Sequence, residues 1–248
     1  PASFCGVYGI KPTLGRIPRF GGVAHPAPNQ VAQAGSMSLT VKDSALLLQV
    51  LAGHDSRDVN TLREKPSDYI ASLDAGVKGL KIAWSPGLGS AAVDPEVVSV
   101  TSKAAVVFEE LGAFVEETEV NIPAEPYAHL NPIILANAYA AYGHFLEQRP
   151  KELSENTRDK LEQGKHITGK DYARALCYLE ELKFQMDMLM DRYDLLLTPT
   201  MAVPAFPLNR RPALIAGRQV ISDWAFNPFN LVSNITGQPS ANIPCGFS

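Results

Sequence analysis

The sequence predicts an α/β fold in which a mixed sheet is flanked by helices. The first observation is an alternating strand over 80–84, an amphipathic helix over 95–111 and a further strand over 113–120. This order favours a right-handed parallel crossover. The second observation is a continuous apolar run over 194–200 that proline stops. Such a run is typical of a strand buried on both faces of a parallel sheet.

The N-terminal part predicts a buried loop and then a helix. Residues 1–29 are rich in Gly and Pro, which break regular elements, yet they carry apolar side chains, so we expect a packed loop with short strands. Thr40 followed by Asp43 indicates a helix N-cap, and Gly53 indicates the stop. The residues expected on the inner face of this helix are Ala45, Leu48, Leu51 and Ala52.

Two further helices are expected over 131–147 and 171–190, separated by a charged, solvated helix and loop over 151–170. Another helix is expected over 223–232, although Pro228 interrupts it, and a last strand over 240–244. The inward residues expected on the helix 171–190 are Leu176, Leu179, Leu182, Met186 and Leu189.

Composition excludes several classes of protein. The 248 residues carry a net charge of −4, and no basic patch stands out, so we expect no direct nucleic-acid contact. No apolar run approaches the ~20 residues of a membrane span. The histidines show no zinc-ligand spacing, so no metal and no cofactor is expected. Three widely spaced cysteines form no disulfide framework, which favours a reducing, cytoplasmic location.

General catalytic motifs are absent from the sequence. No GxSxG elbow, P-loop or GxGxxG is present, and neither Cys5 nor Cys245 has an acid–base partner nearby in sequence. The chain begins with Pro-Ala-Ser and ends on a predicted strand and turn. We therefore expect a fragment truncated at both ends, with frayed surface termini as the alternative.

Five ordered blocks carry a family resemblance. They read PASFCGVYGIKPT (1–13), GSMSLTVKDSALLL (35–48), AGHD (52–55), LLLTPT (195–200) and NITGQPSANIPCGF (234–247). Together they resemble the amidase signature hydrolases from the residues after the nucleophile onward. The resemblance implies a single partial domain over 1–248 that hydrolyses a carboxamide in its intact form.

The resemblance also implies where the catalytic groups lie. The family uses a Ser nucleophile, a second Ser and a Lys, and all three positions fall before residue 1. We therefore expect no catalytic residue within this chain. The isolated chain is therefore expected to be inactive. Ser3, Lys11, Ser36 and Ser38 stand at other positions, and we expect them to serve packing and hydrogen bonding.

Part of the substrate pocket is expected to remain. By the resemblance, Tyr139, Trp224 and Asn227 are candidates to line the acyl side, where an aromatic ring packs on an apolar group and Asn hydrogen-bonds a polar one. The alternative interpretation is core packing for the two aromatic residues and a helix-end cap for Asn227.

Three hypotheses for function stay open. The first is a general amidase with a small-molecule amide substrate. Whether this protein is a monomer or a homodimer stays open. The second is the glutamine-hydrolysing subunit of a tRNA amidotransferase, which would need companion subunits. Alignment by eye places Asn227 and Lys183 where that subunit carries Asp and Arg, and Lys replaces a bidentate Arg poorly, which favours the first hypothesis. The third is a non-catalytic binding or scaffold homologue.

Overall fold

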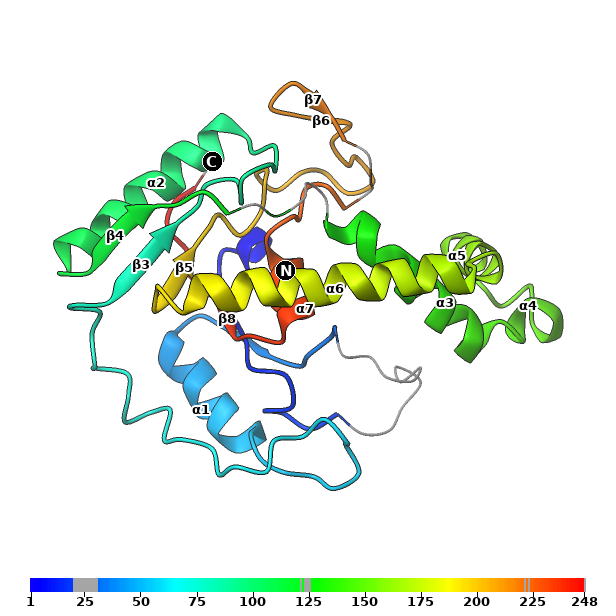
Figure 1. The fold of residues 1–248 in the computed structure, drawn as a ribbon, viewed down its shortest axis with the longest axis horizontal. Helices are drawn as coiled ribbons and strands as arrows, with labels where there is room; N and C mark the ends of the chain where they lie inside the picture. The colour runs from blue at the N-terminus through cyan, green and yellow to red at the C-terminus, as the bar shows by residue number, and fades with distance from the viewer. Residues whose placement is uncertain (20–30, 121, 123–125, 221, 223, 248) are drawn as a thin grey trace.

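The computed structural model describes residues 1–19, 31–120, 122, 126–220, 222 and 224–247. The described chain forms two small three-stranded sheets, one hairpin and the helices that pack on them (Figure 1). The expected mixed α/β class is therefore confirmed. The strands, however, form separate small sheets rather than one sheet. Residues 20–29 of the predicted Gly- and Pro-rich loop over 1–29 lie outside the described residues.

The predicted parallel crossover is present. Strand β3 (Lys81–Trp84) leads into helix α2 (Pro95–Glu110), and β4 (Phe114–Glu117) returns parallel to β3. Asp94 caps α2 by accepting a hydrogen bond from the Glu96 backbone N–H, and proline occupies the first turn. The alternation over 80–84 does not correspond to one buried face, because Ile82, Ala83 and Trp84 are all buried and β3 is therefore covered on both faces.

Strand β5 (Leu195–Leu197) joins β3 in parallel on the other side. The prediction that this run is buried on both faces is wrong, since Leu195 is 40% exposed. Within the described residues β3 is the central strand of the order β4-β3-β5, so β5 is an edge strand. A central position would have been needed to enclose its side chains.

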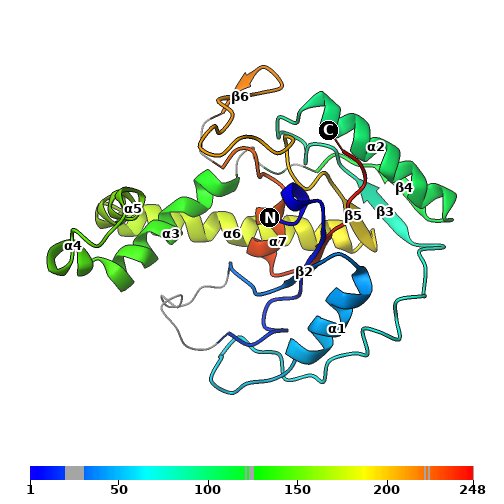
Figure 2. The same ribbon diagram turned by 180° about the vertical axis from the view of Figure 1, so that it is seen from behind.

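The second sheet is antiparallel and has the order β2-β1-β8. Strand β1 (Tyr8–Lys11) pairs with β2 (Ser36–Ser38) and with β8 (Ser240–Asn242), which joins the two ends of the chain in one sheet. A short 3-10 turn, η1 (Ser3–Cys5), precedes β1. Seen from behind, η1 and β1 lie near the middle of the molecule, and the C-terminal residues run beside α2 (Figure 2).

Helix α1 (Val41–Leu51) begins at the predicted cap, where the Thr40 hydroxyl accepts a hydrogen bond from the Asp43 backbone N–H. It packs on β1 and β2 through Ser44, Ala45 and Leu48. The prediction that Leu51 also faces inward is wrong, because Leu51 is 42% exposed. The underlying sheet is short, and the last turn of α1 extends past it.

The helices that follow β4 lie together at one end of the molecule, and a long helix then crosses its middle (Figure 1). Helix α3 (Pro126–Tyr142) ends before Gly143, and α4 (Phe145–Gln148) follows as a separate turn, so the single helix expected over 131–147 is wrong. A Cβ on Gly143 would lie 2.6 Å from the Tyr139 backbone oxygen, so the chain turns there closely against α3. Helix α5 (Glu155–Lys165) is mostly exposed, as predicted, and packs on α3.

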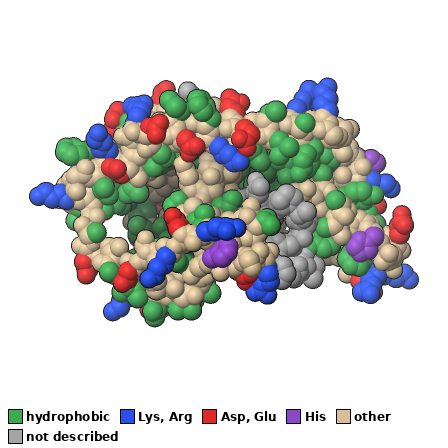
Figure 3. All heavy atoms as spheres, turned by 60° about the horizontal axis from the view of Figure 1, so that its bottom comes forward, with side chains coloured by type: hydrophobic (Ala, Val, Ile, Leu, Met, Phe, Trp, Pro, Cys, Tyr) green, Lys and Arg blue, Asp and Glu red, His purple; other side chains and the backbone are tan. Residues whose placement is uncertain are grey.

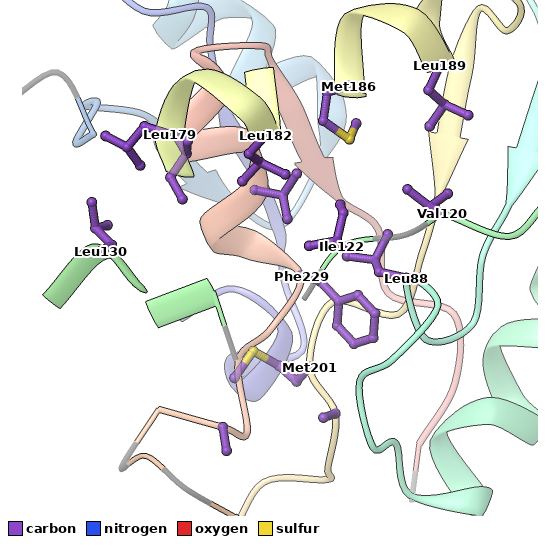
Figure 4. Packing of buried hydrophobic residues seen from close by; sticks show 14 of the residues in the cluster. Leu88, Val120, Ile122, Leu130, Leu179, Leu182, Met186, Leu189, Met201 and Phe229 are labelled. Carbon is purple, nitrogen blue, oxygen red and sulfur yellow. The ribbon is translucent and has the colours of Figure 1, made fainter. Parts of the chain in front are cut away.

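Helix α6 (Gly169–Met190) crosses the molecule and supplies much of the core. A capping box between Thr168 and Asp171 begins it. The side chains that α6 contributes to the core include Leu179, Leu182, Met186 and Leu189, which face Leu88, Ile122, Met201 and Phe229 (Figure 4). Leu176 was predicted inward but lies on the outer face, and Ala175 takes its place.

The C-terminal region differs from the predicted helix over 223–232. Helix α7 (Asn230–Thr236) begins only after Pro228, because a proline disfavours helical backbone in the residue before it. Residue 223, the predicted helix start, lies outside the described residues. Strands β6 (Leu214–Ile215) and β7 (Arg218–Gln219) form a hairpin that sequence patterns did not predict. Within the described ranges, no helix combines the length and apolar character that a bilayer span requires.

The exposed side of α1 is unusually apolar. Leu46, Leu47 and Val50 on α1, with Met37 and Leu39 beside them, are all exposed, and we call these five residues the α1 apolar face. Figure 3 turns the α1 side of the molecule forward and shows apolar side chains among charged ones. This side of the molecule also has a hollow. Contiguous exposed apolar surface favours association.

We therefore expect the isolated chain to bind a hydrophobic dye and to self-associate. The double variant Leu47→Gln, Val50→Gln should reduce both signals while changing the free energy of unfolding by no more than about 0.5 kcal/mol for each substitution. Leu208→Gln is the control, because Leu208 is exposed on a distant loop. Dye fluorescence and sedimentation measure the effect, and equal dye binding by all three proteins would contradict it.

Candidate functional site

The candidate site is built around the turn η1, which the resemblance places directly after the nucleophile. Backbone hydrogen bonds hold this turn: Cys5 N–H donates to the Pro1 and Ala2 carbonyls, and Val7 N–H donates to the Ala2 carbonyl. Gly6 closes the turn with φ +63°, a left-handed conformation that glycine adopts without strain. The position of Phe4 is thereby set against the body of the molecule.

Five aromatic rings connect this turn to the C-terminal region. Phe4 lies edge-on to Phe206 at 5.4 Å between ring centroids and stacks on Phe226 at 6.3 Å. Phe226 stacks on Trp224 at 5.6 Å, and Trp224 contacts Tyr127 of α3 at 5.4 Å. We call these five residues the aromatic cluster. Trp224 is half-buried and packs against the core.

Arg211 covers one side of the aromatic cluster. Its guanidinium carbon lies 5.3 Å from the ring centroid of Trp224 and 6.0 Å from that of Phe226. Cation–π attraction at these distances contributes about 0.5–1 kcal/mol at an exposed site. The contact fastens the loop before β6 to the aromatic cluster.

A series of hydrogen bonds runs beside the aromatic cluster. Asn230 Nδ2 donates to Asn227 Oδ1 at 2.6 Å and to the Thr200 carbonyl at 3.0 Å. Thr200 Oγ1 donates to Asn242 Oδ1 at 2.6 Å, and Asn242 Nδ2 donates to the Val7 carbonyl at 2.8 Å. We call this the amide chain. It joins α7, the segment after β5, and β8 to Val7, which lies between η1 and β1.

The structure brings two of the three predicted site residues together. Asn227 N–H donates to the Trp224 carbonyl at 2.8 Å, so the two residues share one turn. Tyr139 lies elsewhere: it follows Tyr127 by twelve residues on α3, which is about 18 Å along a helix axis. Tyr139 packs near Gly164 of α5, and its substrate role stays a prediction.

Sequence reasoning missed several residues of this region, including Phe206 and Arg211. Tyr127 and Phe226 extend the aromatic cluster, and Asn230 and Asn242 carry the amide chain. A usable signal existed for the two asparagines, because each is a polar amide within an otherwise apolar segment near the chain end. Nothing in the sequence alone marked Tyr127.

Of the serine and lysine side chains considered above, those of Ser36, Ser38 and Lys11 form local hydrogen bonds. Ser36 Oγ and Ser38 Oγ each lie 2.8 Å from Ser44 Oγ, and Lys11 Nζ donates to the Pro12 carbonyl at 2.9 Å. Burial lowers the pKa of Lys11 to about 8, because desolvation disfavours the charged form. In the described part of the chain, no three His, Cys, Asp or Glu residues gather to hold a metal ion.

Comparison with known proteins identifies relatives over the whole chain. The family model described as Amidase matches residues 1–248. An acylamidase of Rhodococcus erythropolis is 32% identical over 100% of the chain, which covers 52% of that protein. A glutamyl-tRNA(Gln) amidotransferase subunit of Chromohalobacter salexigens is 31% identical over 100% of the chain and 54% of its own length.

The solved structures agree with these relatives. The crystal structure of a bacterial aryl acylamidase of the amidase signature enzymes family superposes with a TM-score of 0.89, at 27% identity, over 100% of this chain and 53% of the other. The chain spans about half the length of the relatives it matches. Because the family model matches every residue of the chain, the chain belongs to the amidase signature family.

Proposed function

We propose that the chain is part of an amidase that hydrolyses a carboxamide to a carboxylate and ammonia or an amine. The observation that carries the proposal is the convergence of the aromatic cluster and the amide chain on η1. By the family resemblance, the nucleophile lies a few residues before this turn. A half-buried Trp224 and Asn227 would then face the acyl group of the substrate.

The proposed chemistry is acyl transfer through a serine that lies upstream of residue 1. The serine hydroxyl attacks the amide carbon, a lysine acting through a second serine removes its proton, and backbone N–H groups stabilise the oxyanion. The C–N bond breaks as the amine takes up the proton, and water then releases the acyl group as a carboxylate. In this scheme residues 1–248 supply the surroundings of the substrate rather than the nucleophile.

The proposed substrate is a small-molecule amide, without direct contact to nucleic acid. The net charge of −4 supports this, since phosphate binding needs clustered Lys and Arg. Cys5, Cys177 and Cys245 are free thiols, which supports a reducing, cytoplasmic location. A homodimer remains an open proposal.

The test compares the isolated 248-residue chain with the protein extended upstream in its own reading frame. We expect release of ammonia or amine from simple amides by the extended protein and no turnover above buffer by the isolated chain. Circular dichroism of the isolated chain establishes whether it is folded under the assay conditions. Robust hydrolysis by the folded, isolated chain would show that the nucleophile lies within residues 1–248 and would overturn the proposal.

The glutamine-hydrolysing subunit of a tRNA amidotransferase is the second candidate, favoured by the 31% identity to an amidotransferase subunit over the whole chain. Co-purification of the extended protein with companion subunits, together with glutaminase activity, would support it. A non-catalytic scaffold is the least supported alternative, because the α1 apolar face leaves an exposed surface that a complete small domain would cover.

A further inference from the structure

We infer that Asn227 presents an N–H donor to the substrate, so that the amidase proposed above selects acyl groups carrying a hydrogen-bond acceptor over acyl groups carrying an ammonium group. The inference rests on the proposed function and adds a substrate class to it. Suitable acceptors are ketone, ether, ester or carboxylate oxygens. The reasoning starts from the two ends of the Asn227 amide, which are chemically opposite.

The orientation of Asn230 is the first step. Its Nδ2 atom lies 3.0 Å from the Thr200 carbonyl oxygen, and a backbone carbonyl can only accept a hydrogen bond. The nearby Met201 Sδ, at 3.4 Å, is also only an acceptor. The nitrogen of the Asn230 amide must therefore occupy this position, because its oxygen would face two acceptors.

The orientation of Asn227 follows from that of Asn230. The same Nδ2 atom of Asn230 lies 2.6 Å from the end of the Asn227 amide, and a donor there requires an acceptor opposite it. That end of Asn227 is consequently its Oδ1 atom. The Asn227 amide can reverse only if the Asn230 amide reverses with it, which would break the bond to Thr200.

The other end of Asn227 is the group left for a ligand. No hydrogen bond engages Asn227 Nδ2 among the residues that the structure describes. Asn227 is half-buried, and its Nδ2 atom is not among the enclosed polar atoms that lack a partner. Its backbone N–H is already used by the Trp224 carbonyl. Asn227 therefore offers two N–H hydrogens, whereas its amide oxygen already accepts a hydrogen bond from Asn230 in this orientation.

The amide chain holds this donor in a defined place relative to η1. Asn242 is oriented in the same way as Asn230, because its Nδ2 atom donates to the Val7 carbonyl and its oxygen accepts from Thr200. Phe226, next to Asn227, also stacks on Phe4 of η1. A donor fixed on both sides discriminates between ligands better than one that can rotate, since it cannot turn to suit an ammonium group.

The experiment measures kcat/KM of the extended protein on three matched series of anilides. Acyl chains of increasing length end in a ketone, in the hydrocarbon of the same shape, or in an ammonium group. At the chain length that reaches Asn227, we expect the ketone to exceed both the hydrocarbon and the ammonium member by about tenfold. The hydrocarbon series separates hydrogen bonding from simple apolar preference.

The decisive variant is Asn227→Asp. It keeps an oxygen opposite Asn230 but replaces the presented N–H donor by a carboxylate oxygen, so the preference should reverse by about tenfold toward the ammonium member. Asn230→Leu frees the Asn227 amide to rotate and should bring the ketone-to-ammonium ratio close to one. The control is Asn156→Asp, the same substitution at an exposed site on α5, which should leave the ratio unchanged.

The outcomes separate the two proposals. Turnover with equal ratios for the wild-type protein and for a folded Asn227→Asp variant would overturn the donor assignment and leave the amidase proposal standing. A wild-type preference for the ammonium member at every chain length would do the same without any variant. If no anilide or simple amide is hydrolysed by the extended protein, the amidase proposal falls, and the donor assignment falls with it.

Discussion

Gly15→Ala is expected to lower the free energy of unfolding by at least about 3 kcal/mol. Gly15 has φ +78°, and a Cβ built on it would lie 1.9 Å from the Asn60 backbone oxygen and 2.9 Å from the Asn60 carbonyl carbon. Left-handed backbone alone costs an L-residue about 1–2 kcal/mol. The rest of the loss in stability arises because the clashing atoms belong to the Asn60 backbone. Rotation of a side chain cannot relieve this contact, so the backbone segment must move.

The displaced segment matters because Gly15 joins distant parts of the chain. Its carbonyl accepts hydrogen bonds from Leu62 N–H and from the Thr61 hydroxyl, and the preceding Leu14 N–H donates to the Gly237 carbonyl at the end of α7. We therefore expect the variant to loosen the contact of the N-terminal loop with both regions. Urea denaturation followed by circular dichroism measures the change.

Gly76→Ala is the matched control. Gly76 has φ +72°, close to that of Gly15, but a Cβ there meets nothing within 4 Å. Its cost should be only the conformational part, about 1–2 kcal/mol. Equal losses in the two variants would mean that Asn60 does not crowd Gly15, and the packing described for this loop would be incorrect.

Leu182→Ala is the second substitution with a large expected effect, a loss of about 2–5 kcal/mol. Leu182 is 1% exposed at the middle of α6 and belongs to the core that joins α6 to the strands. Truncation removes apolar contacts and leaves a cavity, since the surrounding helix and strands can relax only partly.

Leu176→Ala on the same helix controls for helix propensity. Leu176 is 45% exposed and lies outside the core, so its truncation should cost less than about 1 kcal/mol. Both variants are compared by the midpoint and slope of urea unfolding. A loss at Leu176 as large as that at Leu182 would contradict the assignment of the inner face of α6.

The sequence predicted elements whose signals are local. The Thr40 cap and the strand–helix–strand order around α2 both depend on neighbours in the chain, and the structure confirms them. The errors concern environment instead. Leu51 and Leu195 are apolar, yet they are exposed because α1 extends past its sheet and β5 lies at an edge. Such positions depend on which elements pack together, and periodicity does not contain that information.

The candidate site was predictable only in part for the same reason. The neighbouring pair Trp224 and Asn227 lies in the C-terminal region that the resemblance indicated, whereas Tyr139 lies apart from them against α5. The direction of the Asn227 amide depends on the Thr200 carbonyl through Asn230, and Thr200 is distant in sequence. A contact of that kind follows from the fold and not from any motif.

The central claim is that these residues complete an amidase whose nucleophile precedes them. The most direct test is to read the coding sequence upstream of the Pro1 codon in frame. We expect codons for Gly-Gly-Ser shortly before Pro1, with a serine pair and a lysine further upstream. An initiation codon immediately before Pro1, or an upstream frame without these residues, would contradict the claim and would make partner binding the function to examine.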